Sequence, residues 1–212
     1  MFIKAKVCLV GEASVGKTSL ARRFVLDQFD DRYLPTMGAK VTKKEVLLEP
    51  EGTQVVLTIW DIMGEPEFRE LLKDGYFRGC NAVLAVADGA RSATVQALAE
   101  WVFAVRRVSG PVPVIVLLNK GDLPPDPESA YALRDHLRVL PGPSWRTSAK
   151  TGENVEAAFL DVARSVARVA VQGRESVLPR RGAPPGARAP PTPSAETAES
   201  EARDEGRDAR NE

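Results

Sequence analysis

A phosphate-binding loop near the N-terminus is the strongest constraint on this chain. Residues Gly11–Thr18 read GEASVGKT and fit the pattern G-x-x-x-x-G-K-[ST]. The two glycines let backbone N–H groups point inward at a phosphate, and a helix that begins at the end of the loop adds the positive end of its dipole. The apolar run Ile3–Val10 is typical of a short buried strand and Lys17–Leu26 of a helix, the order that such a site needs. The sequence therefore predicts a triphosphate cradle, with Lys17 on the β- and γ-phosphates and the Thr18 hydroxyl on Mg²⁺.

A second polar motif, Asn119-Lys120-Gly121-Asp122, directly follows the continuous apolar run Val112–Leu118. Such a run is typical of a central parallel strand, and open α/β sheets bind ligands outside the carboxyl ends of their strands. The Asp122 carboxylate can accept two hydrogen bonds from adjacent N–H donors of guanine, a pattern that adenine does not offer. We expect Asn119 to tie this loop to the phosphate loop and the Lys120 stem to lie along the base. Alone the motif reads as an ordinary polar turn, but with the phosphate loop it predicts a guanine nucleotide site.

Five segments, in order along the chain, resemble the nucleotide-binding segments of Ras-superfamily small GTPases, and their spacing resembles the Rab branch most. These segments are Lys17–Leu20 with Arg23–Phe24, Tyr33–Gly38, Trp60–Gly64, Asn119–Asp122 and Thr147–Lys150. The resemblance covers about residues 1–171. It implies two mobile elements that sense the γ-phosphate, which we call switch I (residues 32–38) and switch II (residues 61–69).

The resemblance implies a role for individual residues of this sequence. Thr36 and Asp61 are similar to the switch residues that hold Mg²⁺, and Gly64 to the glycine whose N–H contacts the γ-phosphate. Phe29 is placed against the guanine, and the Ser148–Lys150 backbone reads the guanine oxygen. The expected nucleotide contacts are Ala13, Ser14, Val15, Gly16, Lys17, Thr18, Ser19, Phe29, Asn119, Lys120, Asp122, Ser148, Ala149 and Lys150. The expected Mg²⁺ ligands are Thr18, Thr36 and Asp61, and the expected catalytic residues are Lys17, Thr36, Gly64 and Glu65.

Switch II departs from the family pattern. Glu65 stands where the family has a glutamine that orients the attacking water, Pro66 replaces a glutamate, and Met63 replaces an alanine. The Glu65 carboxylate is either repelled by the γ-phosphate or accepts from water more strongly than an amide does, so charge alone does not fix the sign of its effect. Arg32 and Arg69 are candidates for an arginine that acts in cis, although a solvated surface role is expected for both.

These features predict a guanine-nucleotide switch that binds GTP or GDP with Mg²⁺ and hydrolyses GTP slowly. The alternative is a scaffold that holds the nucleotide with negligible turnover. A P-loop kinase or ATPase is a weaker third possibility, since Asp122 disfavours adenine and no acceptor site is visible. The resemblance implies effector and regulator proteins that read switch I and switch II, and we expect a monomer.

The sequence predicts a doubly wound α/β domain. Its six-stranded sheet is mostly parallel, has one antiparallel edge strand and carries helices on both faces. The expected strands are Ile3–Val10, Lys40–Leu48, Gln54–Trp60, Ala82–Ala87, Val112–Leu118 and Ser144–Thr147. The expected helices are Lys17–Leu26, Ser92–Val108, Glu128–Arg138 and Glu153–Val171. Trp101, Phe103 and Phe159 are expected to pack helices onto the core.

Composition fits one globular domain with an appendage. The chain has 212 residues, of which 43% are apolar and 27% charged, and its zero formal net charge gives no indication of nucleic-acid binding. Cys8 and Cys80 are expected to be buried free thiols, and His136 a surface or packing residue. Residues 1–171 form the expected GTPase domain. Residues 172–212 are rich in Pro, Ala, Arg and Glu, and are expected to be a disordered tail because they cannot bury enough apolar surface.

The sequence gives little indication of insertion into a membrane or attachment to one. No stretch has the length of a membrane span, and the N-terminus lacks the apolar core of a signal peptide. The chain ends Ala209-Arg210-Asn211-Glu212 without a prenylation cysteine, so no direct lipid anchor is expected. We therefore expect a cytoplasmic protein that a partner can recruit to membranes.

Overall fold

The computed structural model describes residues 1–30, 35–65, 75–128, 131, 134–135 and 142–177. By its contacts the chain divides into one compact unit, Met1–Val177, and a second unit, Leu178–Glu212, which lies outside the described residues. The first unit contains every helix and strand considered below. In chain order these are β1 (Phe2–Val10), α1 (Lys17–Leu26), β2 (Ala39–Leu48), β3 (Thr53–Ile62), β4 (Ala82–Asp88), α3 (Ser92–Gln96), α4 (Leu98–Ser109), β5 (Val114–Asn119), β6 (Ser144–Arg146) and α6 (Val155–Val177).

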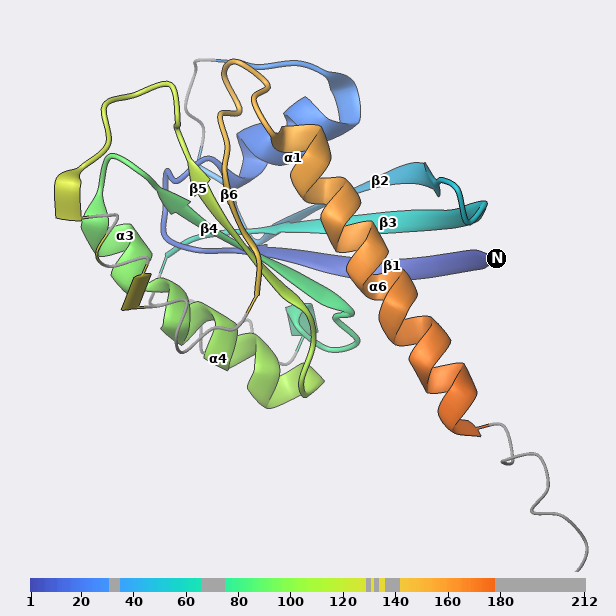
Figure 1. Ribbon diagram of the computed structural model, residues 1–212. Helices are drawn as coiled ribbons and strands as arrows, with labels where there is room; N and C mark the ends of the chain where they lie inside the picture. Colours follow the sequence, from blue (N-terminus) through green and yellow to red (C-terminus); the bar gives the residue numbers. More distant parts are fainter. Residues whose placement is uncertain (31–34, 66–74, 129–130, 132–133, 136–141, 178–212) are drawn as a thin grey trace, which may run out of the picture. The chain divides into compact units, whose positions relative to one another are not determined.

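One six-stranded sheet of order β2-β3-β1-β4-β5-β6 forms the centre of this unit (Figure 1). β2 pairs antiparallel with β3 through the register Val46↔Val55, whereas every other neighbouring pair is parallel. β4 is buried along its whole length, as expected for a parallel strand that is covered on both faces. The predicted fold class is therefore confirmed, including its antiparallel edge.

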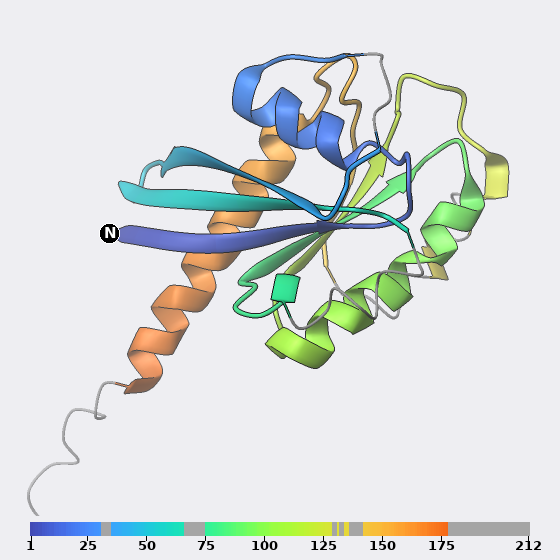
Figure 2. The same cartoon turned by 180° about the vertical axis from the view of Figure 1, so that it is seen from behind.

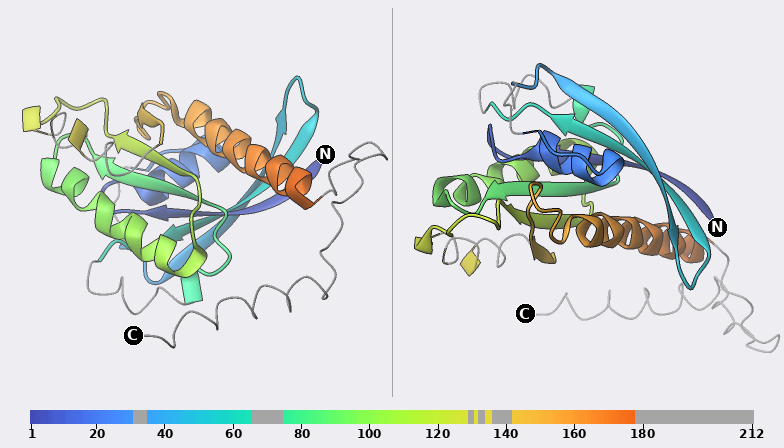
Figure 3. Two further views of the ribbon diagram at one scale, coloured as in Figure 1. Left: turned by 60° about the horizontal axis from the view of Figure 1, so that its bottom comes forward. Right: turned by 90° about the horizontal axis from the view of Figure 1, so that it is seen from above.

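Helices cover both faces of the sheet (Figure 2 and Figure 3). On one face α1 and α6 pack on the inward residues of β1 and β3, and the Phe24 and Phe159 rings stack with their centroids 4.1 Å apart. On the other face α3 and α4 pack on the alternate residues of β1 and β4, and Trp101 belongs to this buried cluster. Both cysteines are buried free thiols in this second cluster, as the sequence predicts.

This topology places a binding crevice at the carboxyl end of β1. β1 lies between β3 and β4 in the sheet, and the chain leaves β1 and β4 toward helices on opposite faces. The connections after these two strands therefore diverge and leave an opening between them. The phosphate loop follows β1 at this point.

Several element boundaries differ from the sequence-based expectation. The helix expected over 92–108 is divided at Ala97, although Ala97 keeps right-handed helical dihedral angles (φ −71, ψ −14). α6 continues to Val177, beyond the predicted end at Val171. Most of the helix expected over 128–138, with His136, lies outside the described residues.

Phe103 does not pack in the core as expected, since 64% of it is exposed. Trp101, two residues earlier on α4, is only 1% exposed. Residues two apart on a helix lie on nearly opposite sides of it, so α4 cannot bury both rings against the same sheet. Trp101 and Phe159 are buried as predicted.

Candidate functional site

The backbone of the phosphate loop depends on its two glycines. Gly11 and Gly16 have φ angles of 137° and 99°, a region that side chains with a Cβ rarely adopt. A Cβ on Gly11 would lie 2.1 Å from the Val86 carbonyl oxygen, and one on Gly16 would lie 2.3 Å from Asn119 Nδ2. The loop therefore packs directly on β4 and on the base-reading loop (Asn119–Asp122), and no larger residue fits at either position.

Lys17 lies across the inside of the phosphate loop. Its Nζ donates to the carbonyls of Gly11 and Glu12, both at 2.8 Å, and the residue is 6% exposed. Burial lowers the pKa of Lys17 to about 8, and the nearby carboxylates of Asp61, Glu65 and Glu12 oppose that shift. The loop thus holds a cation at the position that the motif assigns to the β- and γ-phosphates.

The three predicted Mg²⁺ ligands come together from three separate segments. Thr18 Oγ1 donates to Asp61 Oδ2 at 2.6 Å and lies 3.0 Å from Thr36 Oγ1. Asp61 is 2% exposed, and within the described part of the chain its Oδ1 has no hydrogen-bond partner. Burial raises the pKa of Asp61, while the Thr18 hydrogen bond and Lys17 oppose the rise. Two hydroxyls and a carboxylate with an unused buried oxygen fit a hard cation such as Mg²⁺.

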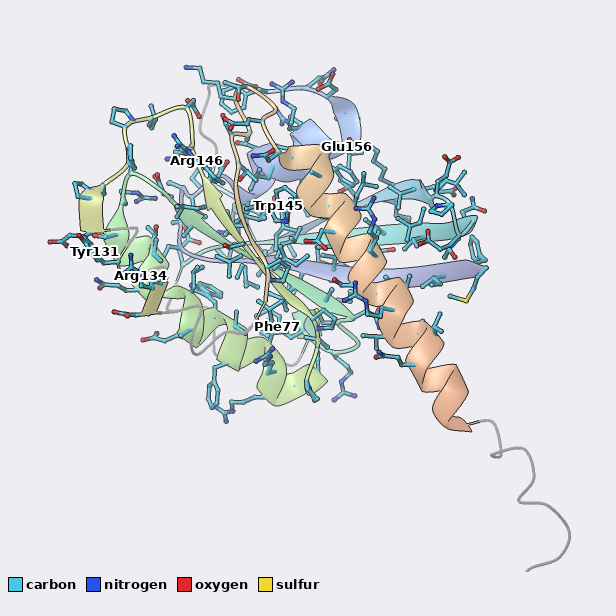
Figure 4. The ribbon with its side chains drawn as sticks, viewed as in Figure 1. Phe77, Tyr131, Arg134, Trp145, Arg146 and Glu156 are labelled. Atoms are coloured by element: carbon cyan, nitrogen blue, oxygen red, sulfur yellow. The ribbon has the colours of Figure 1, made fainter. Side chains whose placement is uncertain are left out.

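The base-reading loop is braced from several sides. Asn119 Nδ2 donates to the Val15 carbonyl at 2.9 Å, and its Oδ1 accepts from the Ala149 N–H at 3.1 Å. Ser148 Oγ donates to Asp122 Oδ1 at 2.6 Å, which orients that carboxylate. Arg146, labelled in Figure 4, donates to the Gly121 carbonyl from β6.

Asp88, at the end of β4, anchors the same loop through Lys120. Lys120 Nζ lies 2.8 Å from Asp88 Oδ2, and Arg91 Nε lies 2.9 Å from the same oxygen. Burial raises the pKa of Asp88, but hydrogen bonds from Lys120, the Ala90 N–H and Arg91 outweigh it and hold the pKa below its ordinary value of 3.8. The Lys120 ammonium is therefore fixed by a charged carboxylate.

The described part of switch II lies against the phosphate loop. A Cβ on Gly64 would lie 2.4 Å from Lys17 Nζ and 2.6 Å from the Ala13 nitrogen, so only glycine allows this approach. Glu65 lines the same cavity, and its charge is near enough to oppose the lowering of the pKa of Lys17. Glu65 therefore lies at the cavity, within electrostatic range of Lys17.

A cavity of about 370 Å³ joins these parts. The predicted residues that line it are Ala13, Ser14, Gly16, Lys17, Thr18, Ser19, Phe29, Thr36, Gly64, Glu65, Asn119, Lys120, Asp122, Ala149 and Lys150. Three predicted residues do not line it. Val15 and Ser148 are buried behind it and act through the bonds given above, and Asp61 reaches it through Thr18.

Among the described residues, sequence reasoning missed Arg22, Asp30 and Leu123 as parts of the lining. Arg22 lies one helical turn after Thr18, so the helix period could have placed it at the cavity. Its Nη1 lies 3.4 Å from Asp30 Oδ2. Arg32, Pro66 and Arg69 lie outside the described residues.

Comparison with known proteins agrees with this geometry. Residues 6–122 match the family model described as Ras of Complex, Roc, domain of DAPkinase. The GTP-binding protein ypt5 of Schizosaccharomyces pombe is 33% identical over 173 residues, which cover 77% of this chain and 78% of the relative. Ras-related protein Rab-4B of Homo sapiens is 34% identical over 168 residues, covering 76% of this chain and 75% of the relative. Ras-related protein Rab-22A of Mus musculus is 34% identical over 164 residues, covering 76% and 82%.

The fold, the phosphate loop and these similarities define a P-loop nucleotide-binding domain. The chain belongs to the Ras superfamily of small GTPases and resembles its Rab branch most.

Proposed function

We propose that this protein is a GTP/GDP switch that hydrolyses GTP slowly in a Mg²⁺-dependent reaction. The observation that best supports this proposal is the convergence of both switches on the phosphate cradle. Thr36 lies 3.0 Å from Thr18, and Gly64 lies against Lys17. A γ-phosphate bound there can order both segments, and its loss releases them.

Binding follows from the donors that face the cavity. The phosphate-loop N–H groups and the Lys17 ammonium hold the β- and γ-phosphates, and Asp122 accepts from the guanine N–H groups. Thr18, Thr36 and Asp61 would hold Mg²⁺, which supplies charge neutralisation when it is bound. Phe29 lines the cavity and offers an aromatic face to the base.

In the proposed reaction a water oxygen adds to the γ-phosphorus and the bond to the β,γ-bridging oxygen breaks, which yields GDP and inorganic phosphate. Lys17 and the Gly64 N–H stabilise the charge that develops on the γ-phosphoryl oxygens. Thr36 holds switch I over the reacting group. Glu65 lines this cavity, so its negative charge would add to the negative charge that accumulates there.

The replacement of the water-orienting glutamine by Glu65, together with Met63, favours a second candidate function. In that case the protein holds GTP or GDP with negligible turnover and acts as a nucleotide-dependent scaffold. Both functions need the same binding site, and they differ only in the rate of the chemical step.

One set of measurements tests the proposed function and separates it from the scaffold. Nucleotide extracted from the purified protein should be GTP or GDP rather than ATP. Phosphate release from preloaded GTP in a single turnover should be slow but faster than the hydrolysis of free GTP in the same buffer, and a chelator should suppress it. No release above the rate of free GTP would favour the scaffold, and equal affinity for ATP and GTP would refute both.

We further propose that effector and regulator proteins bind at the switches. Met37 in switch I is 90% exposed, and Val41 on β2 is 44% exposed beside Trp60.

In the part of the chain that the structure describes, no helix is long and apolar enough to cross a membrane. We propose a cytoplasmic monomer that a partner recruits to membranes.

A further inference from the structure

Trp101 contacts the phosphate loop from α4, which covers the face of the sheet opposite to α1. Its indole Nε1 donates to Glu12 Oε1 at 2.9 Å. Trp101 lies on α4 and is 1% exposed, so the donor is fixed by the packing of the whole ring. A hydrogen bond to a carboxylate from a ring that cannot move holds the Glu12 side chain in one place.

The peptide after Glu12 is the point where the cradle and switch II meet. The Glu12 carbonyl accepts from Lys17 Nζ at 2.8 Å. A Cβ built on Gly64 would lie 2.5 Å from the Glu12 carbonyl carbon and 2.6 Å from the Ala13 nitrogen. A small displacement of this peptide would therefore shift the Lys17 ammonium and change how closely Gly64 can approach the phosphate loop.

The next carbonyl along the loop is held from the same side. Arg91, at the start of α3, donates from Nη2 to the Ala13 carbonyl oxygen at 3.2 Å, and its Nε lies 2.9 Å from Asp88. Consecutive residues of the phosphate loop are thus fixed by side chains of the α3 and α4 segment. The sequence motif gives no sign of this support, because its variable positions carry no residue preference.

We propose that Trp101 is a positioning residue for the nucleotide reaction. Through Glu12 its indole N–H sets the position of the Glu12–Ala13 peptide against Gly64 and Lys17, the two groups that contact the γ-phosphate. GDP lacks this phosphate, so the bond favours the triphosphate state and the hydrolysis step over simple GDP binding. This inference rests on the proposed function of a GTP/GDP switch.

Trp101→Phe tests the proposal because it removes the N–H donor and keeps an aromatic ring. The chain offers a matched control in Trp145, labelled in Figure 4, whose indole Nε1 donates to Asp161 Oδ2 at 3.0 Å between β6 and α6. Trp101→Phe should slow single-turnover hydrolysis about 3- to 10-fold, the scale of one typical intramolecular hydrogen bond. The same variant should lower the ratio of GTPγS affinity to GDP affinity by a similar factor. Its affinity for GDP should stay close to the GDP affinity of the Trp145→Phe variant.

A second pair of variants works from the acceptor side. Glu12→Gln keeps an oxygen that can accept from the indole, whereas Glu12→Leu does not. The glutamine variant should lose less of the affinity ratio than the leucine variant, and adding Trp101→Phe to Glu12→Leu should cause little further loss. This pair also keeps the test usable if Trp101→Phe protein does not fold.

The inference is overturned if Trp101→Phe matches Trp145→Phe in both hydrolysis and affinity ratio. Equal losses in Glu12→Gln and Glu12→Leu would also overturn it, because the charge of Glu12 rather than the hydrogen bond would then matter. Absence of hydrolysis in the wild type would refute the proposed switch instead, while the affinity ratio would still test the role of Trp101.

Discussion

The Asn119 side chain donates to the Val15 carbonyl at 2.9 Å and so joins two loops that are 104 positions apart in the sequence. The same Asn119 amide blocks any Cβ at Gly16. The phosphate loop and the predicted base-reading loop are therefore joined into one structural unit. A substitution in the base-reading loop should therefore lower the affinity for the whole nucleotide.

Asp122→Asn should change the base that this unit selects. The substitution places an amide N–H₂ or a single oxygen against the two N–H donors of guanine, and each donor left unpaired costs about 1–3 kcal/mol. We expect GTP affinity to fall roughly 100-fold and xanthosine triphosphate affinity to rise. Competition binding with both nucleotides measures the exchange. A parallel loss of both nucleotides would mean that Asp122 serves only to hold Ser148.

Thr18→Ala should weaken triphosphate binding mainly through the metal. Thr18 contacts both Thr36 and Asp61, so its loss removes one hydroxyl ligand and leaves the other two without their common partner. Affinity for GTPγS in Mg²⁺ should fall at least roughly 10-fold, whereas affinity in excess chelator should change little. Titrations with and without chelator measure both values. An equal loss under the two conditions would assign Thr18 a structural role in the loop.

The phosphate loop was predictable because its residues lie next to one another in the sequence. Gly16, Lys17 and Thr18 follow one another, and a glycine-rich loop between a strand and a helix has few other uses. The sheet was predictable for a similar reason, since β4 and β5 are unbroken apolar runs. Sequence reasoning could not assign Trp101 or Arg91 to the site. Their contacts with Glu12 and Ala13 depend on how α3 and α4 pack on the far face of the sheet.

Asp88→Asn should destabilise the domain by about 1–2 kcal/mol, because it removes the charge that Lys120 and Arg91 share while both cations remain partly exposed. The folded state holds the pKa of Asp88 below 3.8. The stabilising contribution is therefore present above the unfolded-state pKa and is lost as the pH falls through the lower folded-state value. The difference in urea midpoint between wild type and variant should be the same at about pH 7 and pH 5, and should shrink only in stronger acid.

Asp27→Asn provides the control for Asp88. Asp27 also pairs with an arginine, Arg23, at 3.1 Å, but its side chain is 92% exposed. Exposed pairs contribute little, so this variant should have nearly the wild-type midpoint at every pH. A difference for Asp88→Asn that is no larger than for Asp27→Asn would contradict the anchoring role of Asp88.

Removal of the residues after Val177 should leave nucleotide binding intact. Among the residues that the structure describes, those that line the cavity all lie before Val155, where α6 begins, and the removed segment is rich in proline and charge. The affinity for GDP and the single-turnover rate should match those of the full chain. A lower rate in the shortened protein would assign the segment a regulatory function.

Glu65 should limit hydrolysis through its charge. Glu65 lines the cavity and is within electrostatic range of Lys17, where a γ-phosphate would bring further negative charge. Two like charges about 10 Å apart repel by roughly 1.7 kcal/mol at an effective dielectric constant near 20, so removing one changes a rate by at most about 20-fold. Glu65→Gln removes the charge and keeps a group that orients water, and it should raise the single-turnover rate. Glu65→Ala removes the charge without replacing that group, so it should tighten GTPγS binding with a smaller gain in rate. A slower reaction in both variants would instead make Glu65 the residue that activates the water.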